Sequence, residues 1–321
     1  MTGHGIVLVH ADEYAGWVFD SGHPTQGRRC TLAREMLLAA AHTAQVEVEE
    51  KKADFLPSRK QLALAHSSDH IKRVLDQGIS NEWSGSRLDL GALAHRMAGG
   101  TFIAAKALTE GEALTAVNFA GAKHHAMADH SSGFCVFNDF AMVAKHLLAT
   151  SDTIERIAIM DIDAHHGDGT EALLRSESSV LTFSVHDSTA FPWTGHDDDP
   201  ETATYNRALD GGSGDAELLE AVQDFIAVAQ AFQPDMVFIA IGADGHATDP
   251  LASLTYTVDG RRAATASIRA AFPITPFLLG GAGGYQPDTI TPEAWSQMAL
   301  GAGLLPKVRG KNQERIERSG T

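Results

Sequence analysis

Short apolar runs alternate with longer amphipathic segments along the whole chain, and this alternation predicts an α/β protein. Runs of four to eight residues rich in Val, Ile, Leu and Phe are typical of strands, whereas apolar residues three or four positions apart indicate helices. The predicted strands span residues 5–10, 46–49, 115–118, 156–163, 179–186, 235–241 and 274–280. The predicted helices span residues 29–43, 59–76, 92–109, 138–149, 169–176, 215–232, 261–271 and 292–303.

Several of these strands are continuous apolar runs, as in Met-Val-Phe-Ile-Ala-Ile at 236–241. Such runs are expected when helices cover both faces of a sheet. Strands and helices alternate to the end, and no Pro-, Gly- or Ser-rich segment divides the chain. The pattern therefore predicts one domain over residues 1–321, a three-layer α/β/α fold with a mainly parallel central sheet.

Composition narrows the classes of partner. The formal charge of −16 argues against direct binding to nucleic acid, because an acidic chain repels phosphate. It would suit a cationic substrate, although excess surface acid more often serves solubility. The two cysteines, Cys30 and Cys135, cannot make a disulfide framework, which favours a reducing cytoplasm. Neither a signal sequence nor an apolar run of ~18 residues is present, so no membrane association is expected. The sequence leaves open whether the protein forms a homo-oligomer.

Polar residues that could bind a metal ion or transfer protons follow the predicted strands. In open α/β sheets, ligands bind at the carboxyl ends of the strands. His124 and His125 follow the predicted strand 115–118, and Asp244 follows the strand 235–241. Five titratable residues from Asp161 to Asp168 lie at the end of the strand 156–163 and just after it, and Tyr285 follows the strand 274–280. Four segments distant in sequence are therefore expected to meet in one site.

The densest of these segments is Asp-Ile-Asp-Ala-His-His-Gly-Asp-Gly at 161–169. Alternate residues of an extended strand point the same way, so Asp161, Asp163 and His165 are expected to share a face. Aspartate and histidine suit zinc, and Asp244 is the candidate third ligand, which leaves a position open for catalysis. The alternative is a polar loop whose carboxylates cap the next helix. Five titratable residues within eight positions favour a site.

His124 and His125 are candidates for proton transfer at neutral pH. Adjacent histidines alone are usually surface residues, but this pair precedes a glycine-led apolar turn at 133–139. Asp161 and Asp168 are available to orient the two imidazoles. The glycine-rich segment 280–285 lacks the lysine of a phosphate-binding loop, so we expect it to deliver the Tyr285 hydroxyl to a developing oxyanion.

In combination these motifs resemble the histone deacetylase superfamily, which has the arginase/deacetylase fold. The resemblance runs from His23-Pro24 to Trp295 and is nearest to bacterial acetoin-utilisation-type deacetylases. It rests on four motifs together with Thr-Pro-Glu-Ala-Trp at 291–295. The four are His-His-Ala-Met at 124–127, Gly-Phe-Cys-Val-Phe-Asn-Asp at 133–139, the 161–169 segment, and Gly-Ala-Asp with Asp-Pro-Leu at 242–251. It implies zinc-dependent hydrolysis of an acetyl-amide, with acetyl-lysine in protein as the expected substrate and acetate as a product.

The resemblance also implies roles for individual residues. It places zinc on Asp163, His165 and Asp244, pairs His124 with Asp161 and His125 with Asp168, and makes Tyr285 the electrophilic helper. It implies a tunnel walled by Gly133, Phe134 and Phe191, with Leu251 near its base. A structural potassium ion would lie at Asp161, Asp163, His165, Ser184 and Val185, and a second one near Leu174, Glu177, Val180 and Tyr205.

The chain departs from the family pattern at three places. Ala122 and Lys123 precede the histidine pair where small or apolar residues are usual, and Ala282 interrupts the glycine run. Residues 77–90 form a short segment where many relatives carry an acidic residue at the tunnel lip, and Asp89 is a weak candidate for it.

Three other functions are compatible with the same fold. An arginase-like two-manganese hydrolase would need a carboxylate at position 167, where this chain has glycine. An acetylpolyamine amidohydrolase would use the same site on a cationic substrate. An inactive acetyl-binding module would tolerate loss of a ligand or of the tyrosine, whereas every implied catalytic position is filled here.

Overall fold

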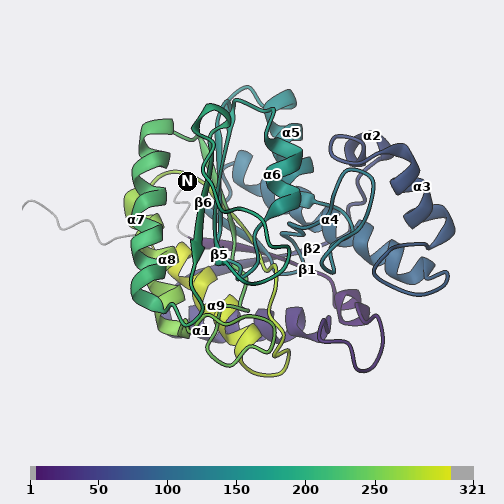
Figure 1. Cartoon of the computed structure of the whole chain (residues 1–321), viewed down its shortest axis with the longest axis horizontal. Helices are drawn as coiled ribbons and strands as arrows, with labels where there is room; N and C mark the ends of the chain where they lie inside the picture. The colour runs from purple at the N-terminus through teal and green to yellow at the C-terminus, as the bar shows by residue number, and fades with distance from the viewer. Residues whose placement is uncertain (1–4, 305–321) are drawn as a thin grey trace, which may run out of the picture.

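Eight strands form one parallel sheet in the computed structural model, which describes residues 5–304 (Figure 1). The strand order across the sheet is β2-β1-β3-β8-β7-β4-β5-β6. The strands are β1 (Gly5–His10), β2 (Glu47–Lys52), β3 (Thr115–Asn118), β4 (Ile157–Asp161), β5 (Val180–Asp187), β6 (Thr204–Leu209), β7 (Met236–Ala240) and β8 (Phe277–Gly280).

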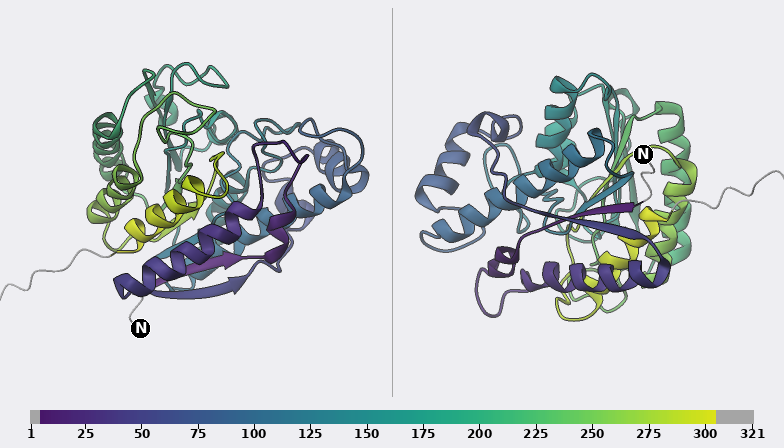
Figure 2. Two further views of the ribbon diagram at one scale, coloured as in Figure 1. Left: turned by 90° about the horizontal axis from the view of Figure 1, so that it is seen from below. Right: turned by 180° about the vertical axis from the view of Figure 1, so that it is seen from behind.

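Helices cover both faces of this sheet, as the two further views in Figure 2 show. Helices α1, α9, α8 and α7 pack side by side on one face, and α4, α5 and α6 lie on the other, with α2 and α3 beyond them. The helices are α1 (Arg28–Ala44), α2 (Arg59–Leu62), α3 (Ser68–Gln77), α4 (Leu88–Thr109), α5 (Asp139–Thr150), α6 (Asp168–Leu174), α7 (Asp215–Phe232), α8 (Val258–Ala271) and α9 (Ile290–Gly303), with short 3-10 turns at Asp12–Gly16 and Pro200–Thr202. The predicted three-layer α/β/α fold is confirmed.

The middle of the sheet is its most buried part. Every residue of β3, β4, β7 and β8 is buried, which explains why β7 and β8 are continuous apolar runs. Burying one Val or Ile side chain contributes about 1.5–3 kcal/mol, so the central strands hold the two helical layers together. Trp295 of α9 stacks on Phe119, just after β3, with ring planes 4° apart.

Two predicted elements change in the structure, and one strand was not predicted. The predicted helix 59–76 is two helices, because α2 ends at Leu62 and the Ser67 side chain caps a new helix by accepting the His70 N–H. Strand β8 begins at Phe277 instead of residue 274, since Ile274 is 81% exposed in the preceding turn. Strand β6 was not predicted, because Thr-Tyr-Asn-Arg-Ala-Leu at the sheet edge is only partly apolar.

The central strands end level with one another at their carboxyl ends. Asn118 and Ala240 both pair with Gly280, and Asp161 pairs with both Ala240 and Ser184. The loops after β3, β8, β7, β4 and β5 therefore leave one edge of the sheet side by side. No helix among residues 5–304 combines the length and apolar character needed to cross a membrane.

Candidate metal centre and active site

Asp163, His165 and Asp244 bring one ligand atom each to within 4.8 Å of one another, and all three residues are buried. His165 Nδ1 lies 3.1 Å from Asp163 Oδ1 and 3.0 Å from Asp244 Oδ2. Asp244 follows β7, as predicted. Strand β4 ends at Asp161, so Asp163 and His165 lie in the loop after the strand and not on its face.

Backbone amides fix the two carboxylates. The Gly283 N–H donates to Asp163 Oδ2 at 2.6 Å, and the Ala164 N–H donates to Asp244 Oδ1 at 2.8 Å. A Cβ atom at position 283 would lie 1.9 Å from Asp244 Oδ2, so the close approach requires glycine. The glycine run after β8 thus shapes the triad as well as carrying Tyr285.

The charges of this triad suit a cation. Burial and the neighbouring charge of Asp163 raise the pKa of Asp244. Burial lowers the pKa of His165, but its hydrogen bonds to the two carboxylates raise it well above the usual value. Within residues 5–304, no Lys or Arg nitrogen lies within 4 Å of either carboxylate. Two buried carboxylates and one imidazole form a donor set that fits zinc.

The two histidines of the pair after β3 each contact an aspartate, as expected. His124 Nδ1 lies 2.7 Å from Asp161 Oδ2, and His125 Nδ1 lies 2.7 Å from Asp168 Oδ1. Burial lowers the pKa of His124, but Asp161 and Asp163 outweigh it and raise the value to about 9. Burial and the neighbouring His124 lower the pKa of His125 to about 4. The pKa values of the two histidines are therefore shifted in opposite directions, upward for His124 and downward for His125.

A cavity of about 340 Å³ leads to the triad. Its lining comprises Glu82, His125, Gly133, Phe134, His165, Phe191, Leu251 and Tyr285. Aromatic rings form its walls: Phe191 lies 5.0 Å from the His125 ring, and Phe134 lies 5.9 Å from the Tyr285 ring. Gly133 has φ +53°, and a Cβ there would meet the His125 ring at 2.3 Å.

The implied position of Leu251 near the tunnel base is wrong. Leu251 is 39% exposed, so it lies where the cavity opens to solvent. The Leu251 N–H donates to Asp249 Oδ1, which keeps the residue in the surface turn after β7.

Tyr285 lies beside the triad, with its ring 6.3 Å from the His165 ring. Asp249 Oδ2 accepts the Tyr285 N–H at 2.8 Å and fixes the backbone there. Burial and Asp244 raise the pKa of Tyr285 well above the usual value. The phenol therefore keeps its proton and can donate a hydrogen bond.

Glu82 is a cavity residue that sequence reasoning missed. Its Oε2 accepts the Phe134 N–H at 2.8 Å, and Phe134 has φ +65°, so the carboxylate holds a strained part of the cavity wall. Burial raises the pKa of Glu82. Asp89, the weak candidate from the sequence, instead pairs with Arg87 at 2.7 Å on the surface. No periodicity marks residues 77–90, so nothing local singled out Glu82.

Two of the residues implied for the first potassium ion, Asp163 and His165, belong to the metal triad, and the other three lie on β4 and β5. Asp161 of β4 pairs with Ser184 of β5, and Val185 is the next residue along β5. Ser184 Oγ lies 3.0 Å from His186 Nδ1. In the second implied set, the backbone carbonyls of Leu174 and Glu177 already accept amide hydrogens.

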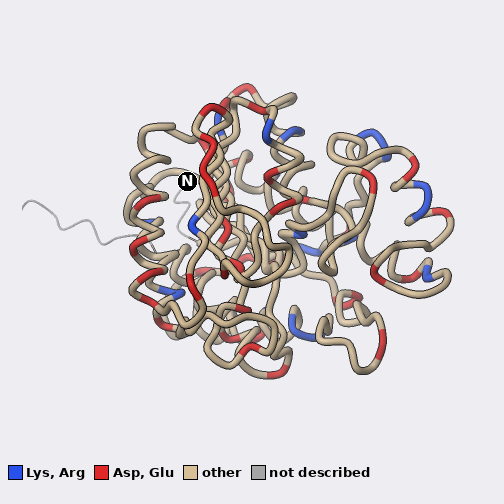
Figure 3. Tube along the Cα trace, viewed as in Figure 1, with Lys and Arg blue, Asp and Glu red and all other residues tan. Residues whose placement is uncertain are grey.

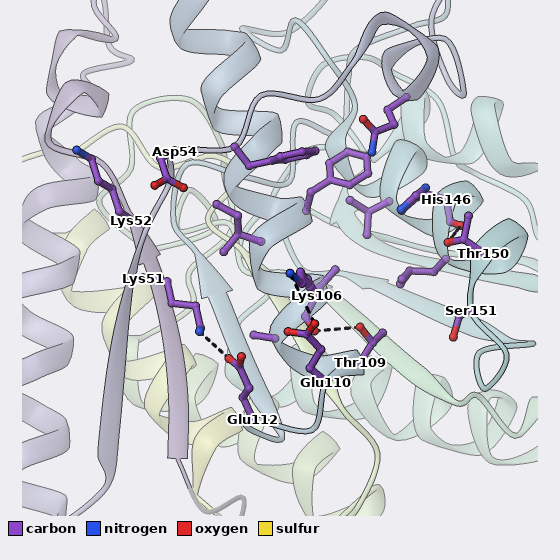
Figure 4. Close-up of a pocket in the computed structure, with 18 residues that line it drawn as sticks. Lys51, Lys52, Asp54, Lys106, Thr109, Glu110, Glu112, His146, Thr150 and Ser151 are labelled. Atoms are coloured by element: carbon purple, nitrogen blue, oxygen red, sulfur yellow. Dashed lines mark hydrogen bonds and ion pairs between the residues drawn. The ribbon is translucent and has the colours of Figure 1, made fainter.

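A larger groove of about 710 Å³ lies away from the triad and shares no residue with it. Figure 4 shows that α4, α5, β2 and the segment after β2 line it. Its charges are mixed and partly paired: Lys51 lies 2.8 Å from Glu112. Asp and Glu residues are spread over helices, strands and loops of the described chain (Figure 3).

Comparison with known proteins gives one consistent result. The chain is similar to the acetoin utilization protein AcuC of Staphylococcus aureus (strain MRSA252), with 27% identity over 91% of this chain and 80% of the relative. It is similar to AcuC of Bacillus subtilis (strain 168), with 28% identity over 92% of this chain and 81% of the relative. The family model described as histone deacetylase domain matches residues 23–301, a range that includes every loop of the site. The chain therefore belongs to the histone deacetylase family, which supports the chemistry of a deacetylating hydrolase.

Proposed function

We propose that this protein is a zinc-dependent deacetylase that hydrolyses Nε-acetyl-lysine in proteins and releases acetate. The observation that carries the proposal is the buried triad of Asp163, His165 and Asp244, whose His165 lines a cavity walled by aromatic rings. Zinc held by these three residues would supply a Lewis acid that polarises the acetyl carbonyl and acidifies water.

His125 is the residue we assign to proton transfer. Asp168 accepts the Nδ1 hydrogen of His125, which leaves Nε2 free to take a proton from the attacking water. The same nitrogen then returns this proton to the departing amine. Burial and the neighbouring His124 lower the pKa of His125, which favours the unprotonated imidazole that a base requires.

His124 and Tyr285 act on the negative charge that develops on the acetyl oxygen. Burial lowers the pKa of His124, but Asp161 and Asp163 outweigh it, which favours a positively charged imidazole beside the triad. Tyr285 keeps its proton and donates a hydrogen bond to the oxyanion. Both side chains are already held in position before the substrate binds, so they need little rearrangement to reach the transition state.

The cavity wall favours a substrate with a methylene chain. Phe134 and Phe191 offer apolar surface along this wall. An acetylpolyamine is the alternative substrate, favoured by the net charge of −16. We further propose that a structural potassium ion binds at Asp161, Ser184 and Val185. We also propose that the chain forms one deacetylase domain and has no direct nucleic-acid partner. A cytoplasmic location would suit the free cysteines Cys30 and Cys135.

The test compares zinc-loaded protein on acetyl-lysine peptides, acetylpolyamines and longer acyl-lysines, with elemental analysis of the metal. We expect about one zinc per chain and preference for the peptides. Asp163→Asn should lose both zinc and activity. Two manganese ions per chain would contradict the proposal, and preference for acetylpolyamines would select the alternative substrate.

A further inference from the structure

Trp193 presents its indole ring to solvent beside the wall of the 340 Å³ cavity. The ring lies 5.6 Å from the ring of Phe191, the wall residue two positions before it, and the two ring planes meet at 78°. Trp193 is 67% exposed, whereas Phe191 is only partly exposed. The indole therefore lies one ring outward from the cavity wall.

The backbone of Trp193 is unusual for a residue of this size. Its φ of +61° lies in the left-handed region, which glycine adopts freely and a bulky side chain adopts only at a cost. Among residues 5–304, the aromatic residues with positive φ are Phe134 and Trp193, and Phe134 lines the cavity. Backbone strain of this kind gathers at functional sites, where the surrounding structure holds it in place.

The segment that carries Trp193 is held on both sides of the residue. The Trp193 N–H donates to the Ala190 carbonyl at 3.0 Å. Thr194 Oγ1 lies 2.8 Å from Nδ1 of the buried His166, and a Cβ atom at Gly195 would lie 2.5 Å from the His166 ring. The exposed indole therefore stands on a backbone that is fixed against the interior.

Leu251 is a second exposed apolar side chain at the opening of this cavity. One buried carboxylate anchors both segments: Asp187 Oδ1 accepts the Thr189 N–H at 2.9 Å, and Asp187 Oδ2 accepts the Ser253 N–H at 2.8 Å. Thr189 lies two positions before Phe191, and Ser253 lies two positions after Leu251. The opening therefore has two apolar side chains on segments that share one anchor.

We propose that Trp193, assisted by Leu251, determines specificity by binding an aromatic side chain next to the acetyl-lysine of a protein substrate. The inference rests on the proposed function, because an acetyl-lysine whose acetyl group reaches the triad leaves its backbone and its neighbours at the opening. Contact with an aromatic ring would remove the indole from water and add a ring pair like that of Trp193 and Phe191.

The cavity lining gives less support to a cationic neighbour. Its carboxylate, Glu82, already accepts the Phe134 N–H at 2.8 Å and supports the wall. An apolar contact with Trp193 is therefore the recognition that the opening favours. An acetylpolyamine has no residue in this position, so Trp193 would favour protein substrates in particular.

The test uses the zinc-loaded full chain and acetyl-lysine peptides that carry Phe, Gly or Arg beside the acetyl-lysine, on either side in turn. We expect the wild type to prefer Phe to Gly on one side, and Trp193→Gly to lower this kcat/KM ratio by about tenfold, the scale of one aromatic contact. The loss should appear in KM, because the contact is equally strong in the ground state and the transition state.

The variant and its control are matched for exposure. Glycine suits a φ of +61°, so Trp193→Gly should fold as the wild type does, which thermal unfolding checks. Ile274→Ala removes another exposed apolar side chain, 81% exposed in the turn before β8, and should leave the Phe/Gly ratio unchanged.

Peptide binding separates this inference from the proposed function. Fluorescence anisotropy would measure the affinity of labelled peptides for Tyr285→Phe and for Tyr285→Phe/Trp193→Gly. Tighter binding of the Phe peptide that depends on Trp193, in a protein whose wild type hydrolyses no acyl-lysine, keeps the subsite and removes the proposed function. Equal Phe/Gly ratios in the wild type and Trp193→Gly overturn the subsite, and a preference for Arg that depends on Trp193 overturns the aromatic assignment.

Discussion

Replacing Tyr285 with Phe removes one hydroxyl from the inner end of the cavity and leaves the ring in place. The ring contacts, 5.9 Å from the Phe134 ring and 6.3 Å from the His165 ring, do not involve that oxygen. Loss of one donor to an oxyanion lowers kcat by about 10²–10³, or about 2.7–4 kcal/mol. We expect a fall of this size in Tyr285→Phe, with KM nearly unchanged, because the hydrogen bond strengthens in the transition state.

The assay is steady-state hydrolysis of an acetyl-lysine peptide by the zinc-loaded proteins, with thermal unfolding as a check on the fold. Tyr256→Phe is the matched control, because the Tyr256 hydroxyl is also buried but has no hydrogen-bond partner within the described chain and lines no part of the cavity. Its activity should equal that of the wild type. A Tyr285→Phe protein as fast as this control would refute the assigned role.

Three further outcomes are expected. Gly283→Ala should abolish zinc binding in elemental analysis, because its Cβ would lie 1.9 Å from Asp244 Oδ2, whereas Gly22→Ala, with 3.6 Å to its nearest neighbour, should bind zinc normally. A hydroxamate should inhibit by reaching the metal through the cavity, and full activity at high concentration would argue against an open site. Burial, and then the neighbouring His70, lowers the pKa of His66 from 6.5 to about 3, so its contribution to stability is complete above pH 6.5 and is lost as pH falls toward 3. This contribution is at most roughly 5 kcal/mol, and urea unfolding of His66→Asn should therefore depend less on pH in that window than the wild type does.

The central sheet could be predicted because strands that are buried on both faces contain mostly apolar residues. Strands β7 and β8 are short apolar runs, and their length is typical of a buried strand and too short for a helix. Edge strand β6 carries Asn and Arg because one side of it faces solvent. Its segment is a strand because it pairs with β5. Pairing between strands is a tertiary effect that local patterns do not record.

The site could be located from the sequence for a similar reason. Asp163, His165 and Asp244 come just after apolar strands, and parallel strands bring the loops at their carboxyl ends to one edge of the sheet. The sequence could not show that Glu82 supports Phe134, because the two lie 52 positions apart and meet only in three dimensions. Nor could it place Leu251, whose position in the cavity depends on the path of a surface turn.

The place of β8 in the sheet governs how the chain can fold as it is synthesised. The last strand along the sequence lies between β3 and β7, in the interior of the sheet. Until residue 280 has left the ribosome, the nascent chain holds two half-sheets whose inner edges are open to mispairing. The two half-sheets can therefore join only after β8, the last strand of the chain, has been synthesised. Tyr285 lies just after β8 in the sequence, so it can take its place beside the triad only once this segment has been synthesised.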